Sequence, residues 1–267
     1  MTEGHNAQDN IGDYLFLFCF YRKFVCRLIG NNASGRDIAV RMKAEEIIRG
    51  VYQVGGSNLT SADDAAVYLI DFGDDVILID AGAGRSTAKI IQNIQMLGIN
   101  ADRISHLILT HCHIDHIGSA PFFQKNFHTK IVIHELDAPA VEKGDPVRTA
   151  ANWYGANFPP TKIDLKLKGK EEVLPFGSEK LYCLHTPGHT PGSIAAYLDR
   201  DGKRVLFGQD IHGPFHKSFG SNIEDWKKSM HLLLSLEADI LCEGHFGIYQ
   251  PKQKVRGYIE GYLEEYE

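Results

Sequence analysis

The chain has 267 residues, of which 43% are hydrophobic and 23% are charged, and it contains no long low-complexity stretch. This composition is typical of a folded enzyme built as one α/β unit. The net charge of −6 provides no basic surface, which argues against nucleic acid as a partner.

Five cysteines occur without a close CxxC pair, and their odd number leaves one unmatched in any disulfide scheme. The simplest setting for such a chain is a reducing cytoplasm, so we predict a cytoplasmic protein.

Residues 1–41 differ in character from the rest, and we predict a boundary between this N-terminal extension and one domain at 42–267. The aromatic-rich run at 14–21 is too short to span a bilayer. Glu3 and Asp9 precede it in place of positive charge, which argues against a signal peptide. The extension could be a docking or dimerising helix, which leaves a homo-oligomer open. Alternatively Met42 is the functional start, so that residues 1–41 are not part of the native chain; this is the interpretation we favour.

From Met42 the pattern alternates between strand and helix signals. A first strand is predicted at 50–54, and strands at 66–71 and 75–80 should form a hairpin. Ser86 precedes a helix that places Ile90 and Ile94 on one face, and Gly98 offers a left-handed stop.

The next strand signal, the apolar run at 104–109, ends where four strong metal-binding side chains crowd into six residues: His111, His113, Asp115 and His116. Side chains alternate in an extended segment, so His111 and His113 should face the same way and share one ion. Asp115 and His116 could reach a second position if the chain turns into a helix there. Burying so many polar groups would require a partner for each, and divalent cations satisfy them together.

The later part of the chain predicts a second sheet and another covering helix. Ser221 and Glu224 have capping-box spacing. An apolar stripe follows, which we interpret as core; it comprises Ile223, Trp226, Met230, Leu233 and Leu234. The strands of the second sheet are predicted at 180–185, 194–198, 204–207 and 240–243.

Four further segments accompany the histidine cluster in order: 76–82 with Asp80, 186–193 with His189, 206–210 with Asp210, and 242–245 with His245. With His111-x-His113-x-Asp115-His116, these motifs resemble the signature of the metallo-β-lactamase superfamily over residues 42–250. The resemblance implies a four-layer αββα sandwich.

The resemblance also implies the ligands of two divalent metal ions. One ion would be held by His111, His113 and His189, a second by Asp115, His116 and His245, and Asp210 would lie between them. Imidazole and carboxylate ligands suit zinc first, with iron and manganese as alternatives, and neither set closes a coordination shell. Two such ions can generate hydroxide near neutral pH.

Neighbouring residues are predicted to support the site. Asp80 is expected to orient a ligating histidine, and Cys112 to be a buried small hydrophobe. We interpret four further histidines as structural, although the last two follow Asp210 closely enough to line a pocket; they are His134, His185, His212 and His216.

The segment at 135–175 lacks a metal motif and should shape the substrate pocket. Its aromatic and proline residues predict either an apolar or acyl-binding surface or simple packing of a lid, two interpretations that stay open; they are Trp153, Tyr154, Phe158, Pro159 and Pro160.

The favoured function is a dinuclear metal-dependent hydrolase that attacks a small-molecule thioester or lactone with a metal-bridging hydroxide. Asp115 is the catalytic candidate, because it could orient the hydroxide or carry a proton. Gly213 stands where some lactonases have a tyrosine, and the basic C-terminal pattern of glyoxalase II enzymes is missing.

Two alternatives remain. The histidine motifs also resemble the mononuclear iron persulfide dioxygenases, in which His113, His189 and Asp210 would hold the iron. Against this, residues 211–215 replace the stretch that those enzymes have after the aspartate. A non-catalytic metal-binding module is the third possibility, but every expected ligand is present.

Overall fold

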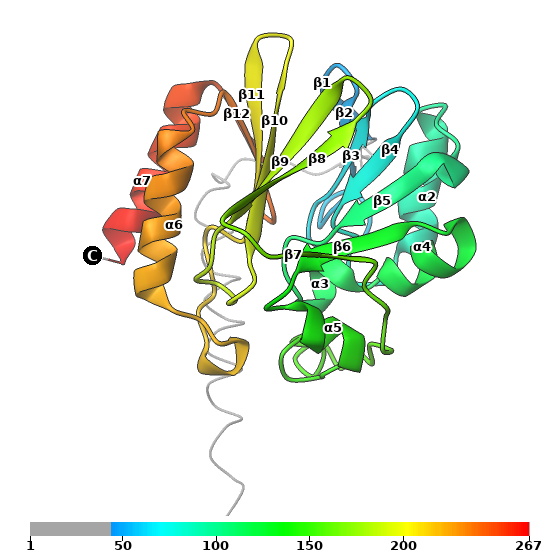
Figure 1. Ribbon diagram of the computed structural model, residues 1–267, viewed down its shortest axis with the longest axis horizontal. Helices are drawn as coiled ribbons and strands as arrows, with labels where there is room; N and C mark the ends of the chain where they lie inside the picture. Colours follow the sequence, from blue (N-terminus) through cyan, green and yellow to red (C-terminus); the bar gives the residue numbers. More distant parts are fainter. Residues whose placement is uncertain (1–43, 267) are drawn as a thin grey trace, which may run out of the picture. The chain divides into compact units, whose positions relative to one another are not determined.

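The computed structural model describes residues 44–266, so the predictions made for residues 1–41 lie outside the described part. Two β-sheets form the centre of this domain (Figure 1). The first contains, in spatial order, β1 (Glu45–Ile48), β2 (Val51–Gly55), β3 (Val67–Asp71), β4 (Val76–Ile79), β5 (Ile104–Ile108), β6 (Lys130–His134) and β7 (Leu165–Leu167). The second contains β13 (Ile248–Tyr249), β12 (Ile240–Glu243), β11 (Lys203–Gln209), β10 (Ile194–Arg200), β9 (Glu179–His185) and β8 (Glu171–Phe176).

The two sheets combine antiparallel and parallel pairing. Strands β1 to β4 pair antiparallel, whereas β4 to β7 run parallel. In the second sheet only β11 and β12 are parallel. Because β4 and β5 are parallel, and β11 and β12 are parallel, the carboxyl ends of each pair lie at the same edge of its sheet. The predicted site residues follow these strand ends.

Helices cover the outer face of each sheet and complete four layers (Figure 1). The first sheet carries α2 (Thr87–Met96), α4 (Ala120–Phe127) and α5 (Ala138–Lys143), and the second carries α6 (Ile223–Ser235) and α7 (Lys252–Glu265). The short helix α3 (Ile114–Ile117) and the 3₁₀ turns η1 (Ala101–Arg103) and η2 (Lys217–Phe219) lie in connections. The predicted αββα sandwich is therefore confirmed.

The sequence pattern of β4 explains why it sits inside the sandwich. Val76 and Leu78 pack with Ile90 of α2, while Ile77 and Ile79 join the core between the sheets. Burial on both faces accounts for an apolar run that does not alternate with polar residues. The strand is thereby held rigidly up to Asp80, which follows its last residue.

The strand predicted at 50–54 is confirmed as β2, but it is not the first strand, and a second local prediction was wrong. β1 precedes β2, and its exposed glutamates Glu45 and Glu46 conceal the strand signal at a sheet edge. The cap of α6 is Asn222, whose side chain accepts a hydrogen bond from the N–H of Asp225 at 3.2 Å. Ser221 instead donates to the carbonyl oxygen of His189 at 2.7 Å, so it supports a site loop.

A stacked pair of histidines joins the two sheets. The rings of His134, at the end of β6, and His185, at the end of β9, lie 3.9 Å apart and are inclined by 7°. The Nε2 atom of His134 is buried without a hydrogen-bond partner. Burial, and then the neighbouring His185 ring, lower the pKa of His134 from 6.5 to about 4 against the opposing effect of Glu172.

This pair predicts a pH-dependent contribution to stability. Between pH 6.5 and 4, His134 is protonated in the unfolded chain but neutral in the folded protein, so protons favour unfolding in this range. The contribution of neutral His134 to the free energy of unfolding is therefore complete above pH 6.5 and is lost as the pH falls toward 4. We expect the advantage of the wild type over His134→Gln in the free energy of unfolding to shrink by about 2 kcal/mol from pH 7 to pH 4.5. Urea denaturation at several pH values measures it, and an advantage that does not change with pH would contradict it.

Candidate metal centre

The predicted ligands lie close together at the edge where the carboxyl ends of strands from both sheets meet. The segment after β5 supplies four of them, the loop after β9 supplies His189, and residues just beyond β11 and β12 supply Asp210 and His245. Asp80 (φ 61°) and Gln209 (φ 48°) adopt left-handed backbone conformations beside the site. Such conformations are uncommon outside glycine and concentrate where function fixes the backbone.

Three histidines form the first group. The Nδ1 atom of His113 lies 3.1 Å from Nε2 of His111 and 2.8 Å from Nε2 of His189. All three rings are buried. The segment is a loop that follows β5, as predicted; it bends at residues 110–112 and is not extended, yet its two histidines meet.

The second group comprises Asp115, His116 and His245. The Oδ2 atom of Asp115 lies 3.4 Å from Nε2 of His245 and 3.8 Å from Nε2 of His116. Helix α3 begins at Ile114, so the predicted turn into a helix brings the adjacent Asp115 and His116 to the same place.

The carboxylate of Asp210 lies between the two groups. Its Oδ1 atom is 3.1 Å from Nε2 of His116 and 3.3 Å from Nε2 of His245. Its Oδ2 atom is 3.4 Å from Nε2 of His189 and 3.9 Å from Nε2 of His111. Each oxygen thus faces one group, as a bridging ligand would.

The electrostatics of the two groups differ. Burial, assisted by the neighbouring rings, lowers the pKa of His111 and His113 well below the usual range, and burial lowers that of His189 to about 4. These rings are therefore neutral and retain lone pairs at pH 7. Burial also disfavours the charged form of His245, but the carboxylates of Asp210 and Asp115 outweigh it and raise its pKa to about 9.

The donor set fits divalent cations. Nε2 of His116 and Oδ1 of Asp210 are buried without a hydrogen-bond partner, and the ligand atoms of each group lie within 4.8 Å of one another. An unpartnered buried polar atom is costly, whereas coordination to a cation satisfies it. Neutral imidazoles and carboxylates suit zinc and other first-row divalent ions. The cluster is thus compatible with divalent metal binding.

Asp80 takes the supporting position predicted for it. Its Oδ2 atom accepts a hydrogen bond from Nδ1 of His116 at 2.7 Å and another from the hydroxyl of Thr110 at 2.7 Å. The N–H of Thr110 donates to its other oxygen at 2.8 Å. This arrangement fixes the His116 ring so that Nε2 faces the site.

Sequence reasoning missed Asp137, which ties two site loops together. This buried carboxylate accepts hydrogen bonds from the N–H of Cys112 at 3.0 Å, the hydroxyl of Thr190 at 2.7 Å and the N–H of Gly192 at 2.9 Å. It thus links the loop of His111 and His113 to that of His189. The flanking residues of Asp137 contain no motif, so only the fold reveals this role.

Changing Asp137 to asparagine should loosen this connection. An amide would direct N–H donors at N–H or hydroxyl donors, leaving at least one buried group unsatisfied, so we expect a loss of about 1–3 kcal/mol in the free energy of unfolding. Urea denaturation measures the loss. Asp74→Asn on the exposed surface is the matched control, expected to change stability by less than about 0.5 kcal/mol; equal stability of the two variants would refute the role.

Cys112 is buried within the core of the first sheet, as predicted, and its thiol donates to the carbonyl oxygen of Arg148 at 3.3 Å. Burial raises the pKa of this thiol well above its usual range. The side chain therefore stays a neutral thiol and does not behave as a metal ligand.

The aromatic residues of segment 135–175 separate into two groups. Phe158 is buried in the core and Tyr154 packs against it, which is the packing interpretation. Trp153 instead contacts Phe219, with ring centroids 4.8 Å apart, and Phe219 lies 4.3 Å from the ring of His113. An aromatic wall, which we define as Trp153, His216 and Phe219, therefore borders the first group.

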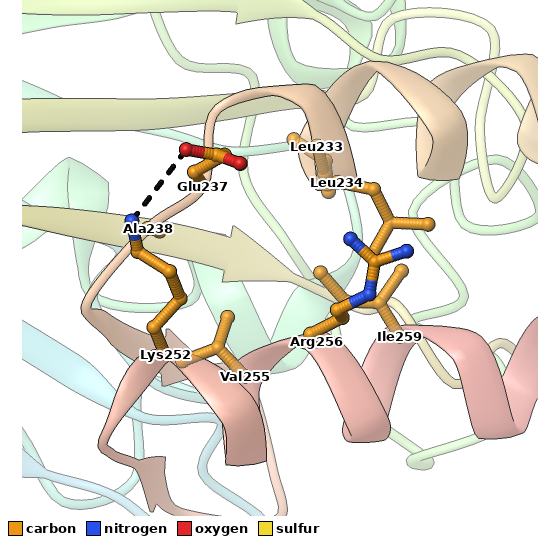
Figure 2. A pocket seen from close by; sticks show the side chains of 8 residues that line it. All are labelled: Leu233, Leu234, Glu237, Ala238, Lys252, Val255, Arg256 and Ile259. Atoms are coloured by element: carbon orange, nitrogen blue, oxygen red, sulfur yellow. Dashed lines mark ion pairs between the residues drawn. The ribbon is translucent and has the colours of Figure 1, made fainter.

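A small depression elsewhere does not involve the site. Figure 2 shows that residues of α6 and α7, with Glu237 and Ala238 that follow α6, line it, and that Lys252 pairs with Glu237 at 3.6 Å. Its volume of about 30 Å³ accommodates on the order of two water molecules.

No helix in the described range 44–266 is both long and apolar enough to cross a membrane.

Comparison with known proteins extends these observations. The family model described as the metallo-beta-lactamase superfamily matches residues 61–245. A Bacillus subtilis protein named probable metallo-hydrolase YflN is 28% identical over 68% of this chain and 80% of its own length. The chicken acyl-coenzyme A thioesterase MBLAC2 is 24% identical over 78% of this chain and 81% of its own.

The fold is similar to that of a solved metallo-beta-lactamase from Cronobacter sakazakii with a HARLDQ motif. The TM-score is 0.72, the identity is 20%, and the match covers 84% of this chain and 93% of that one. At this level of identity the similarity concerns the fold alone.

Proposed function

Because this chain belongs to the metallo-beta-lactamase superfamily, we propose that it is a dinuclear metal-dependent hydrolase that cleaves a small acyl thioester. The observation that carries the proposal is Asp210, whose two oxygens face two separate ligand groups. One group is His111, His113 and His189, and the other is Asp115, His116 and His245. Zinc is the proposed ion, with iron and manganese as alternatives.

Two divalent cations held by these residues would supply Lewis acidity and would lower the pKa of a bound water to near neutrality. The residues of the chain position this chemistry. Asp210 would offset the positive charge of both cations, and Asp80 keeps Nε2 of His116 directed at the site. Asp115 places a carboxylate oxygen 3.4 Å from Nε2 of His245, where it can orient a water or hold its proton.

The thioester is favoured over the lactone by the surroundings of the site. The aromatic wall gives an apolar acyl chain a surface next to His113. One of the similar proteins is named an acyl-coenzyme A thioesterase. A lactone receives less support, since Gly213 takes the place of the lactonase tyrosine.

The mononuclear dioxygenase is less well supported. That enzyme would hold its iron with His113, His189 and Asp210. The second group, Asp115, His116 and His245, would then have no metal to bind. This second group is assembled as closely as the first, with ligand atoms within 4.8 Å of one another. The two-cation hydrolase uses both.

An assay of acyl-coenzyme A esters of increasing chain length, with lactones in parallel, tests the proposal. Thiol release should require zinc, stop after chelation and return when zinc is restored. Trp153→Ala should raise KM for octanoyl esters about 10-fold and leave that for acetyl esters nearly unchanged, because a lost apolar contact costs on the order of 1–3 kcal/mol. No thiol release from any ester by the zinc-loaded protein would refute the thioesterase proposal.

A further inference from the structure

His212 lies at the edge of the candidate centre, outside both ligand groups. Its ring centroid is 5.2 Å from that of His245, and the two rings are nearly perpendicular. One of its nitrogens, an oxygen of Asp210 and a nitrogen of His245 all lie within 4.8 Å of one another. His245 therefore belongs to two candidate ligand sets, one with Asp115 and His116 and one with Asp210 and His212.

The fully buried Glu243 fixes the His212 ring. Its Oε1 atom accepts a hydrogen bond from Nδ1 of His212 at 2.9 Å. Its Oε2 atom accepts from the N–H of His245 at 2.6 Å and from that of Phe246 at 2.7 Å. One carboxylate therefore positions two neighbouring histidines, and the Phe246 ring packs against His212 with centroids 4.6 Å apart.

The way His212 is held matches the two ligand histidines whose Nδ1 partners are best defined. His116 donates Nδ1–H to Asp80 at 2.7 Å, and His189 donates it to the carbonyl oxygen of Pro214 at 2.9 Å. In both, Nε2 is then the nitrogen that faces Asp210, at 3.1 Å in His116 and 3.4 Å in His189. Metal-binding histidines are oriented in this way, and a carboxylate partner also makes the ring a better ligand.

We propose that His212 is a further metal ligand, whose Nε2 binds the same cation as Asp210 and His245, with Glu243 as its positioning residue. This inference rests on the proposed two-cation function and adds to it. A histidine at this position supplies another nitrogen to a group that otherwise contains two imidazoles and carboxylates. This additional ligand would increase the affinity for the second cation and reduce the number of its coordination positions that remain open to substrate.

Zinc titration of the metal-free protein against a chromophoric chelator tests the assignment. His212→Gln should weaken binding of the second zinc equivalent by about 10- to 100-fold and leave the first unchanged, while Glu243→Gln should give a smaller loss of the same kind. Replacement of zinc by Co²⁺ adds a spectroscopic readout, because loss of one nitrogen ligand alters the visible absorption bands. His231→Gln, on the exposed side of α6, is the matched control and should match the wild type.

Each result decides the matter. A His212→Gln variant that keeps both affinities within about twofold and the same Co²⁺ spectrum overturns the assignment even if its activity falls. If the wild type in the same experiment binds two cations and hydrolyses thioesters, only the role of His212 fails. A wild type that binds a single cation overturns the proposed two-cation function together with this inference.

Discussion

Replacing Asp210 with asparagine is expected to lower kcat/KM on the order of 10³-fold and to weaken the binding of both proposed cations. The carboxylate is buried, and its two oxygens face the two ligand groups at 3.1–3.9 Å. Burial raises its pKa, but His116 and His245 outweigh burial and hold the pKa well below the usual range. The substitution would remove the negative charge and turn an N–H₂ donor toward one of the groups.

Steady-state kinetics and elemental analysis of the same preparation measure both effects. Asp74→Asn removes one carboxylate from the exposed surface and should retain wild-type activity and metal content. Full activity of the Asp210→Asn variant with unchanged metal content would eliminate the bridging role and, with it, the division of the ligands into two groups.

The second large effect is predicted at Gly118, where alanine should destabilise the fold by about 3 kcal/mol or more. The backbone of Gly118 is right-handed helical, so alanine suits the local conformation. However, a Cβ atom would overlap the backbone of Ala83 and Gly84. This close contact accompanies a hydrogen bond from the N–H of Ala81 to the carbonyl oxygen of His116 at 2.7 Å.

Thermal or urea denaturation of Gly118→Ala measures the loss. Gly257→Ala is the matched control, because Gly257 is also helical and nothing lies within 4 Å of its added Cβ. That variant should gain about 0.5–1 kcal/mol from helix propensity. If both substitutions were stabilising, the close approach between the segment at 81–84 and α3 would not exist in the folded protein.

The fold and the ligand cluster were accessible from the sequence for physical reasons. Strand β4 is buried on both faces and carries a continuous apolar run that ends just before Asp80. Strand β5 ends in the buried Leu107 and Ile108, and the histidine cluster follows shortly after it. A dense set of imidazoles and carboxylates has few explanations besides a cation. The superfamily and the enzyme class of a metallo-hydrolase agree with the comparisons.

Long-range hydrogen bonds could not be predicted. Asp137 contacts residues 25 to 55 positions away along the chain, and Glu243 lies 31 positions from His212. Neither pairing leaves a local pattern in the sequence, although Glu243 lies inside the segment 242–245 that also carries His245. Strand β1 was missed because its exposed glutamates weaken the apolar strand pattern. The cap of α6 was placed one residue too early because Ser221 and Asn222 are both suitable cap residues, and Asn222 makes the hydrogen bond.

The most direct test of the two-cation site is the ratio of metal to protein in the chain purified without added metal. We predict about two zinc ions per chain, or about two of another first-row divalent ion, because two ligand groups share Asp210. A ratio close to one iron ion per chain would contradict the dinuclear hydrolase and favour the mononuclear dioxygenase, and a ratio near zero would contradict both.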